Sequence, residues 1–150
     1  MFAPLLDSRR SRLLIALGAT VALAGGVSAA RAEMVKLHAN MNAASEVPPT
    51  SSKGTGTAEF TYDTASKKLE WTVSYKNMSG PVTAGHIHGP AEPGKNAGVE
   101  VPFQNAGSSP IKGSATLTDA QAADLMGGKD YVNLHTAENK GGEIRGQIMK

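Results

Sequence analysis

Apolar and polar residues alternate in short runs after residue 33, with the period of two that is typical of half-buried strands. In one run, Leu69, Trp71 and Val73 stand between polar neighbours, so one face of the strand is apolar. Clusters of Gly, Pro, Asn and Ser separate the runs and indicate turns. The pattern predicts about eight strands, at residues 35–41, 58–62, 69–75, 82–88, 99–103, 111–117, 131–136 and 143–149.

One short helix interrupts this series. Thr118 and Gln121 have the spacing of a capping box, in which each residue satisfies a free backbone N–H group of the other. Gly127 and Gly128 follow and end the helix. The elements together predict an all-β fold, an antiparallel Greek-key-like sandwich or barrel of about eight strands with one short helix.

The last two strands form a predicted hairpin. The simplest register pairs residues 132, 134 and 136 with residues 148, 146 and 144. Val132 and Leu134 then face the core, and His135 lies opposite Arg145 on the outward face.

The first 32 residues have a different pattern. Arg9, Arg10 and Arg12 precede an apolar stretch at residues 13–24, and residues 30–32 have the small-x-small form of a cleavage site. We expect residues 1–32 to be a signal peptide and residues 33–150 to be one mature domain. The paired arginines resemble a twin-arginine signal. The alternatives are a general secretory signal and a retained anchor, although the apolar stretch is short for a bilayer span.

Charge and cysteine content narrow the function classes. The formal net charge is +2, but the leader contains four basic residues and one acidic residue, which leaves 11 basic and 12 acidic residues in 33–150. A nearly neutral domain gives no electrostatic basis for nucleic-acid binding. The chain has no Cys, so the expected exported domain depends on its core rather than on disulfides. We expect a periplasmic or secreted protein without a stable membrane span after cleavage.

Histidines carry the candidate chemistry. His86 and His88 alternate with Ile87 in one predicted strand, so both imidazoles face outward while Ile87 faces the core. His135 joins them if the final hairpin lies beside this strand. Three neutral imidazoles suit copper or zinc and leave one coordination position open. The alternative is that these histidines only form hydrogen bonds or face solvent.

Two further residues have open assignments. Arg145, opposite His135 in the predicted register, can draw a small anion to the site, or it can form a weak surface ion pair with Glu143 or Asp130. His38 is an exposed strand residue or a fourth metal ligand. Among other motifs, a Gly-x-Ser-x-Gly elbow and a phosphate-binding Gly-rich loop are absent. Glu138 and Glu143 flank a turn, where we expect both to be solvated.

Several motifs, in the same order along the chain, resemble the CHRD (chordin) domain family. They lie at residues 46–49, 54–58, 85–90, 117–118, 131–136 and 142–148. The resemblance covers nearly all of the mature chain. It implies a stand-alone exported protein of the bacterial type. The family also occurs in chordin, a secreted antagonist of bone morphogenetic proteins, but a single copy without Cys-rich modules does not imply that activity here.

A second resemblance concerns the histidines alone. Copper–zinc superoxide dismutase is a β-sandwich in which a His-x-His strand and a late-strand His hold copper, while an Arg guides the anion. The similar positions here are His86, His88, His135 and Arg145. The bridging His, the zinc-ligand cluster and the disulfide cysteines of that family have no counterparts.

Three functions remain open from the sequence. The first is a non-catalytic binding module with a site for copper or zinc, whose partner is an unidentified protein or small anion. The second is a copper-dependent redox enzyme that uses the same site. The third is a structural or adhesion domain without any cofactor.

Overall fold

The computed structural model describes residues 31–150. The expected signal peptide lies outside these residues except for Arg31 and Ala32, so its cleavage stays a prediction. Within the described range, no helix combines the length and apolar character needed to cross a membrane.

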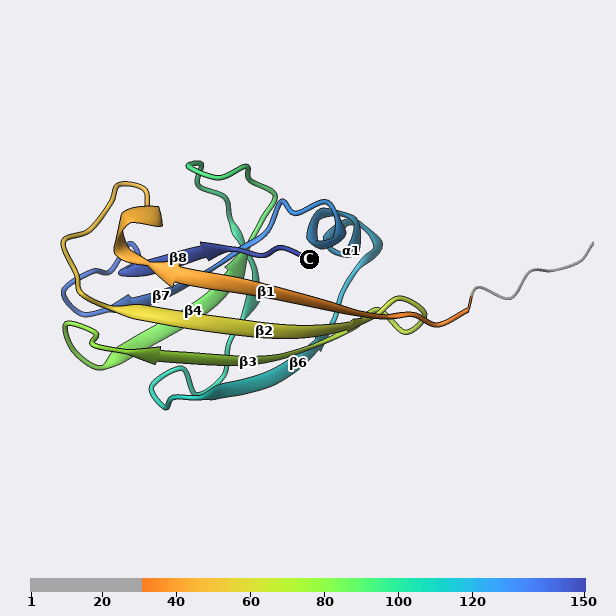
Figure 1. Ribbon diagram of the computed structural model, residues 1–150, viewed down its shortest axis with the longest axis horizontal. Helices are drawn as coiled ribbons and strands as arrows, with labels where there is room; N and C mark the ends of the chain where they lie inside the picture. The colour runs from red at the N-terminus through yellow and green to blue at the C-terminus, as the bar shows by residue number, and fades with distance from the viewer. Residues whose placement is uncertain (1–30) are drawn as a thin grey trace, which may run out of the picture.

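Eight antiparallel strands form one sheet in the order β5-β4-β7-β8-β1-β2-β3-β6. The sheet curls into a nearly closed barrel, with the chain end close to β1 and α1 (Figure 1). The predicted all-β fold with eight strands and one short helix is confirmed. The elements are β1 (Met34–Asn42), η1 (Ala43–Ser45), β2 (Thr55–Asp63), β3 (Lys68–Lys76), β4 (Val82–His88), β5 (Val99–Pro102), β6 (Ile111–Thr116), α1 (Asp119–Met126), β7 (Tyr131–Thr136) and β8 (Ile144–Gln147).

The apolar positions of the alternating runs fill the barrel interior. Leu69 and Val73 are fully buried, and Trp71 between them is 6% exposed, as the alternation predicts. The Trp71 ring lies 5.0 Å from the ring of Phe103, between centroids. It also lies against Gly113, where a Cβ would stand 2.5 Å from the indole. A glycine on the neighbouring strand therefore makes room for the largest side chain of the core.

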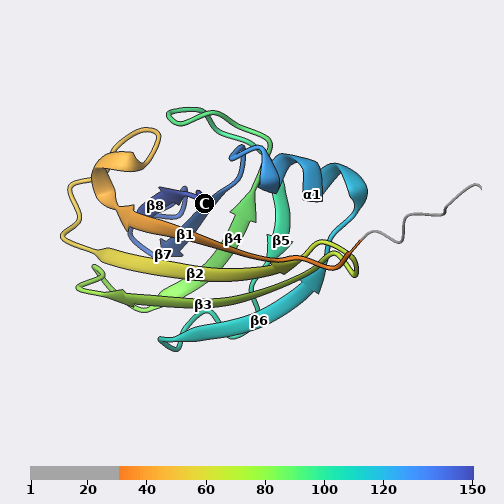
Figure 2. The ribbon, with the colours of Figure 1, turned by 45° about the vertical axis from the view of Figure 1, so that its right-hand side comes forward.

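The helix α1 lies at one end of the barrel (Figure 2). The predicted capping box is present, because the Thr118 side chain accepts from the Gln121 N–H and the Gln121 side chain accepts from the Thr118 N–H. Leu125 is 1% exposed and joins the core. The helix thus closes the apolar interior at this end.

The predicted register of the last hairpin is wrong by two residues. Leu134 pairs with Ile144 and Asn133 pairs with Arg145, so His135 is not opposite Arg145. The turn takes up more chain than expected because Glu143 folds inward and accepts a hydrogen bond from the Thr136 hydroxyl. A two-residue slip leaves every side chain on its predicted face, since the side-chain period of a strand is two.

Candidate metal centre

Two neighbouring strands bring the three predicted histidines together. His86 and His88 lie on β4, with Ile87 between them pointing into the core at 1% exposure. β7 pairs with β4 and places His135 opposite Ala84, beside the outward face that carries His86. The condition that the last hairpin must lie beside the His-x-His strand is therefore met.

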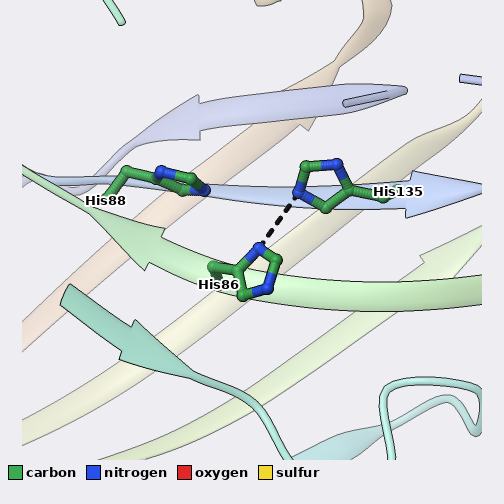
Figure 3. A group of neighbouring side chains, drawn as sticks. All are labelled: His86, His88 and His135. Atoms are coloured by element: carbon green, nitrogen blue, oxygen red, sulfur yellow. Dashed lines mark hydrogen bonds between the residues drawn. The ribbon is translucent and has the colours of Figure 1, made fainter. Parts of the chain in front are cut away.

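The ligand atoms of His86, His88 and His135 lie within 4.8 Å of one another. Nδ1 of His86 is 3.1 Å from Nε2 of His135. Figure 3 shows the three rings facing a common point, with His86 and His88 on β4 and His135 on β7. His38 is exposed on β1 and stands outside this group, so the open assignment of His38 as a fourth ligand gains no support.

Hydrogen bonds from two rings determine which of their nitrogens carry the proton. Nδ1 of His88 lies 3.0 Å from the Ala97 carbonyl oxygen, and Nδ1 of His135 lies 2.9 Å from that of Lys140. A carbonyl only accepts, so both Nδ1 atoms carry the proton and both Nε2 atoms have a lone pair. This arrangement is typical of metal-binding histidines, whose second nitrogen donates to a backbone carbonyl.

Burial keeps two of the rings neutral. It is the main cause that lowers the pKa of His86 and of His88, and the neighbouring His135 lowers both further. Neutral imidazole is the form that binds metal. Nε2 of His88 is buried and has no hydrogen-bond partner among the described residues. An unpaired buried acceptor is costly unless a ligand satisfies it, so the residues present fit a metal ion.

A stack of three side chains positions His88. Its ring lies parallel to that of Tyr131, with centroids 5.0 Å apart. The Arg145 guanidinium covers the other face of Tyr131 at 3.9 Å from the ring centroid. Cation–π and stacking contacts of this kind limit the motion of each ring.

The partners of Arg145 differ from those predicted. It is 4% exposed, and its Nε donates to Glu46 at 3.1 Å, not to Glu143 or Asp130. Its remaining nitrogens donate to the Lys95 carbonyl and to the Asn96 side chain. These contacts bind the guanidinium to the loop at residues 89–98, and the attraction of an anion by Arg145 stays a prediction.

Sequence reasoning missed the polar layer beneath this site. Glu46, Asn133 and Arg145 are all at least nine-tenths buried. In the sequence, Glu46 stands out only as the first residue of the motif at residues 46–49. Burial raises the pKa of Glu46, while the Arg145 charge and the Asn133 amide favour its ionised form. The signal that could have revealed the layer is the concentration of charged and amide residues on one outward face of the final hairpin.

Glu143 was also assigned to the wrong environment. Glu138 is exposed as expected, but Glu143 is fully buried. Hydroxyl groups of Ser52 and Ser79 donate to its carboxylate at 2.6 Å. The position of Glu143 beside a turn did not predict its exposure, because other loops fold over that turn.

The family model of the CHRD domain matches residues 37–148. The chain belongs to the CHRD family. The match begins within β1, extends past the end of β8 and includes all three histidines of the site. Among curated proteins and solved structures, no significant match was found. The likeness to superoxide dismutase therefore rests on the histidine pattern alone.

Proposed function

We propose that this CHRD protein is an exported, non-catalytic binding module that holds one copper or zinc ion through His86, His88 and His135. The observation that carries the proposal is the convergence of three imidazoles, two of which have Nδ1–H bonded to a carbonyl and therefore an Nε2 lone pair. The lone pair of His88 has no partner, and that of His135 accepts from Nδ1 of His86. Copper(II) and zinc(II) are the ions that a cluster of neutral imidazoles suits best.

The surroundings of the histidines favour binding over catalysis. A cavity of about 530 Å³ lies over β1, β2 and β3, and none of the three histidines lines it. A redox enzyme needs a position where substrate meets the metal, whereas Tyr131 and the loop at residues 89–98 cover the side of His88. The expected export of the mature chain would place the module in a compartment outside the cytoplasm.

Calorimetric titration of zinc and copper into the purified protein and four single variants tests this function. His86→Ala, His88→Ala and His135→Ala should each weaken binding by more than the roughly 10–100-fold that follows loss of an outer-shell partner. His38→Ala is the matched control and should bind like the parent, because His38 lies outside the group. Equal binding by all four variants, or no binding by the parent, would contradict the proposal.

A further inference from the structure

We propose that the side-chain oxygen of Asn133 is a fourth ligand of the metal site, so that the protein supplies all four donors. This inference rests on the proposed metal-binding function and adds a residue type that the histidine pattern does not contain.

The sheet places Asn133 on the same face as the three histidines. It lies on β7 two residues before His135, and it pairs directly with His86 across β4. Directly opposed residues of antiparallel strands have Cβ atoms about 4.5–5.5 Å apart, and residues two positions apart share a face. Asn133 is 1% exposed, so it forms the buried floor of the group.

Two buried acceptor atoms lack partners at this place. Within residues 31–150, Oδ1 of Asn133 and Nε2 of His88 are both buried without a hydrogen bond. His88 lies on β4 and Asn133 on the neighbouring strand β7, and both side chains are on the face that carries His86. Two unpaired acceptors buried on the same face are unfavourable unless a cation or a donor satisfies them. A metal ion held by the histidines meets that requirement.

The orientation of the Asn133 amide follows from its contact with Glu46. Nδ2 of Asn133 donates to Oε1 of Glu46 over a long 3.4 Å, and Glu46 also accepts from Arg145. A carboxylate only accepts, so the amide nitrogen faces Glu46 and the amide oxygen is left free of that contact. At Gly142, a Cβ would stand 2.5 Å from both Nδ2 of Asn133 and Oε1 of Glu46. Gly142 thus makes room for this contact.

A fourth ligand from the protein changes what the site can do. Three imidazoles and one amide oxygen form a neutral donor set that suits divalent zinc or copper better than copper(I), which prefers softer ligands. Four protein ligands also close the coordination sphere, as in structural zinc sites, whereas catalytic sites keep one position open. The inference therefore gives a physical reason for a module that binds metal without turnover.

Asn133→Leu removes the oxygen at similar side-chain volume. We expect zinc affinity to fall by about tenfold or more. We also expect the copper-loaded variant to bind azide, an anionic probe of open coordination positions, with a new near-ultraviolet absorption band. The copper-loaded parent should show no such band. Asn139→Leu is the matched control, because Asn139 is an amide on the same hairpin that contacts Glu143 instead of the histidines.

The outcomes separate this inference from the proposed function. If His135→Ala abolishes binding while Asn133→Leu binds zinc like the parent, the fourth ligand is refuted and the three-histidine site stands. An azide band in the copper-loaded parent would refute it as well. If the parent binds no metal, both proposals fail. Should Asn133→Leu not fold, Asn133→Asp keeps the oxygen and adds charge, and zinc affinity equal to that of the parent would overturn the inference.

Discussion

Two polar clusters are built around residues of the final hairpin, and they differ in how their atoms are paired. In the Glu143 cluster, hydroxyl, backbone and amide groups all donate to one carboxylate. Burial alone would make the charged form of this carboxylate unfavourable. The donors are Ser52, Ser79, Thr136 and Asn139. Burial raises the pKa of Glu143, but these hydrogen bonds outweigh it and hold the pKa at about 2.

The cluster of His86, His88, His135 and Asn133 has the opposite composition. Its rings donate outward to loop carbonyls, while buried acceptors on His88 and Asn133 remain without partners in the described range. A cluster whose acceptors are all matched by donors stabilises the fold and has nothing left for a ligand. A cluster in which two buried acceptors lack donors is stable in full only when a cation binds. The pairing of polar atoms thus separates a structural cluster from a binding site.

The largest expected effect comes from Glu143→Gln. The amide has the same shape but brings its own N–H groups against several donors, so the free energy of unfolding should fall by about 2–4 kcal/mol. Because the pKa of Glu143 is lower in the folded protein, its contribution is present above pH 4.5 and is lost as pH falls towards about 2. Urea denaturation between pH 2 and 7 measures both effects. A variant as stable as the parent at pH 7 would contradict this interpretation.

The next prediction tests the difference between the Glu143 cluster and the histidine cluster through metal binding. Zinc at about 100 times its dissociation constant should stabilise the parent by about 2.7 kcal/mol, since it binds only the folded state. Glu143→Gln should keep this increment although its starting stability is lower, because Glu143 is not a ligand. His135→Ala should lose the increment and keep a metal-free stability close to that of the parent. Thermal unfolding of the three proteins with and without zinc measures the six values, and a zinc increment in His135→Ala would refute the contrast.

The last prediction concerns Asp130, a third buried polar group that belongs to neither cluster. Burial, followed by the charges of Glu100 and Asp124, raises its pKa from 3.8 to about 7. A raised pKa favours the folded state at low pH, and that advantage is lost as pH rises from about 4 through 7. Asp130→Asn should therefore gain stability relative to the parent as pH rises from about 4 to 7.5. If the free energies of unfolding of Asp130→Asn and of the parent changed with pH in the same way across that range, the raised pKa of Asp130 would be contradicted.

Local sequence patterns predicted the structure correctly wherever a feature depends on interactions between residues close together in the chain. Alternation placed Trp71 inside the barrel, and the spacing of Thr118 and Gln121 identified the start of α1. The common face of His86 and His88 followed from strand geometry alone. Each of these features depends on periodicity or on contacts within a few residues, which the sequence displays directly.

The burial of Glu46, Glu143 and Arg145 could not be read in the same way. Their surroundings come from residues far away in the chain, as in the Arg145–Glu46 pair, which spans 99 positions. The register of the final hairpin failed for a related reason. Alternation is unchanged by a slip of two residues, so only the inward turn of Glu143 against Thr136 selects the observed pairing.

By itself, the sequence determined an all-β domain of the CHRD family, the inward and outward faces of its strands, and the histidines worth considering. Only the tertiary structure decided that β7 lies beside β4, which brings His135 to His86. It also decided that loop carbonyls orient two of the rings and that Asn133 lies buried beneath them. The physical reason is that ligand geometry depends on long-range strand order and on loops that cover a face, and neither leaves a periodic signal along the chain.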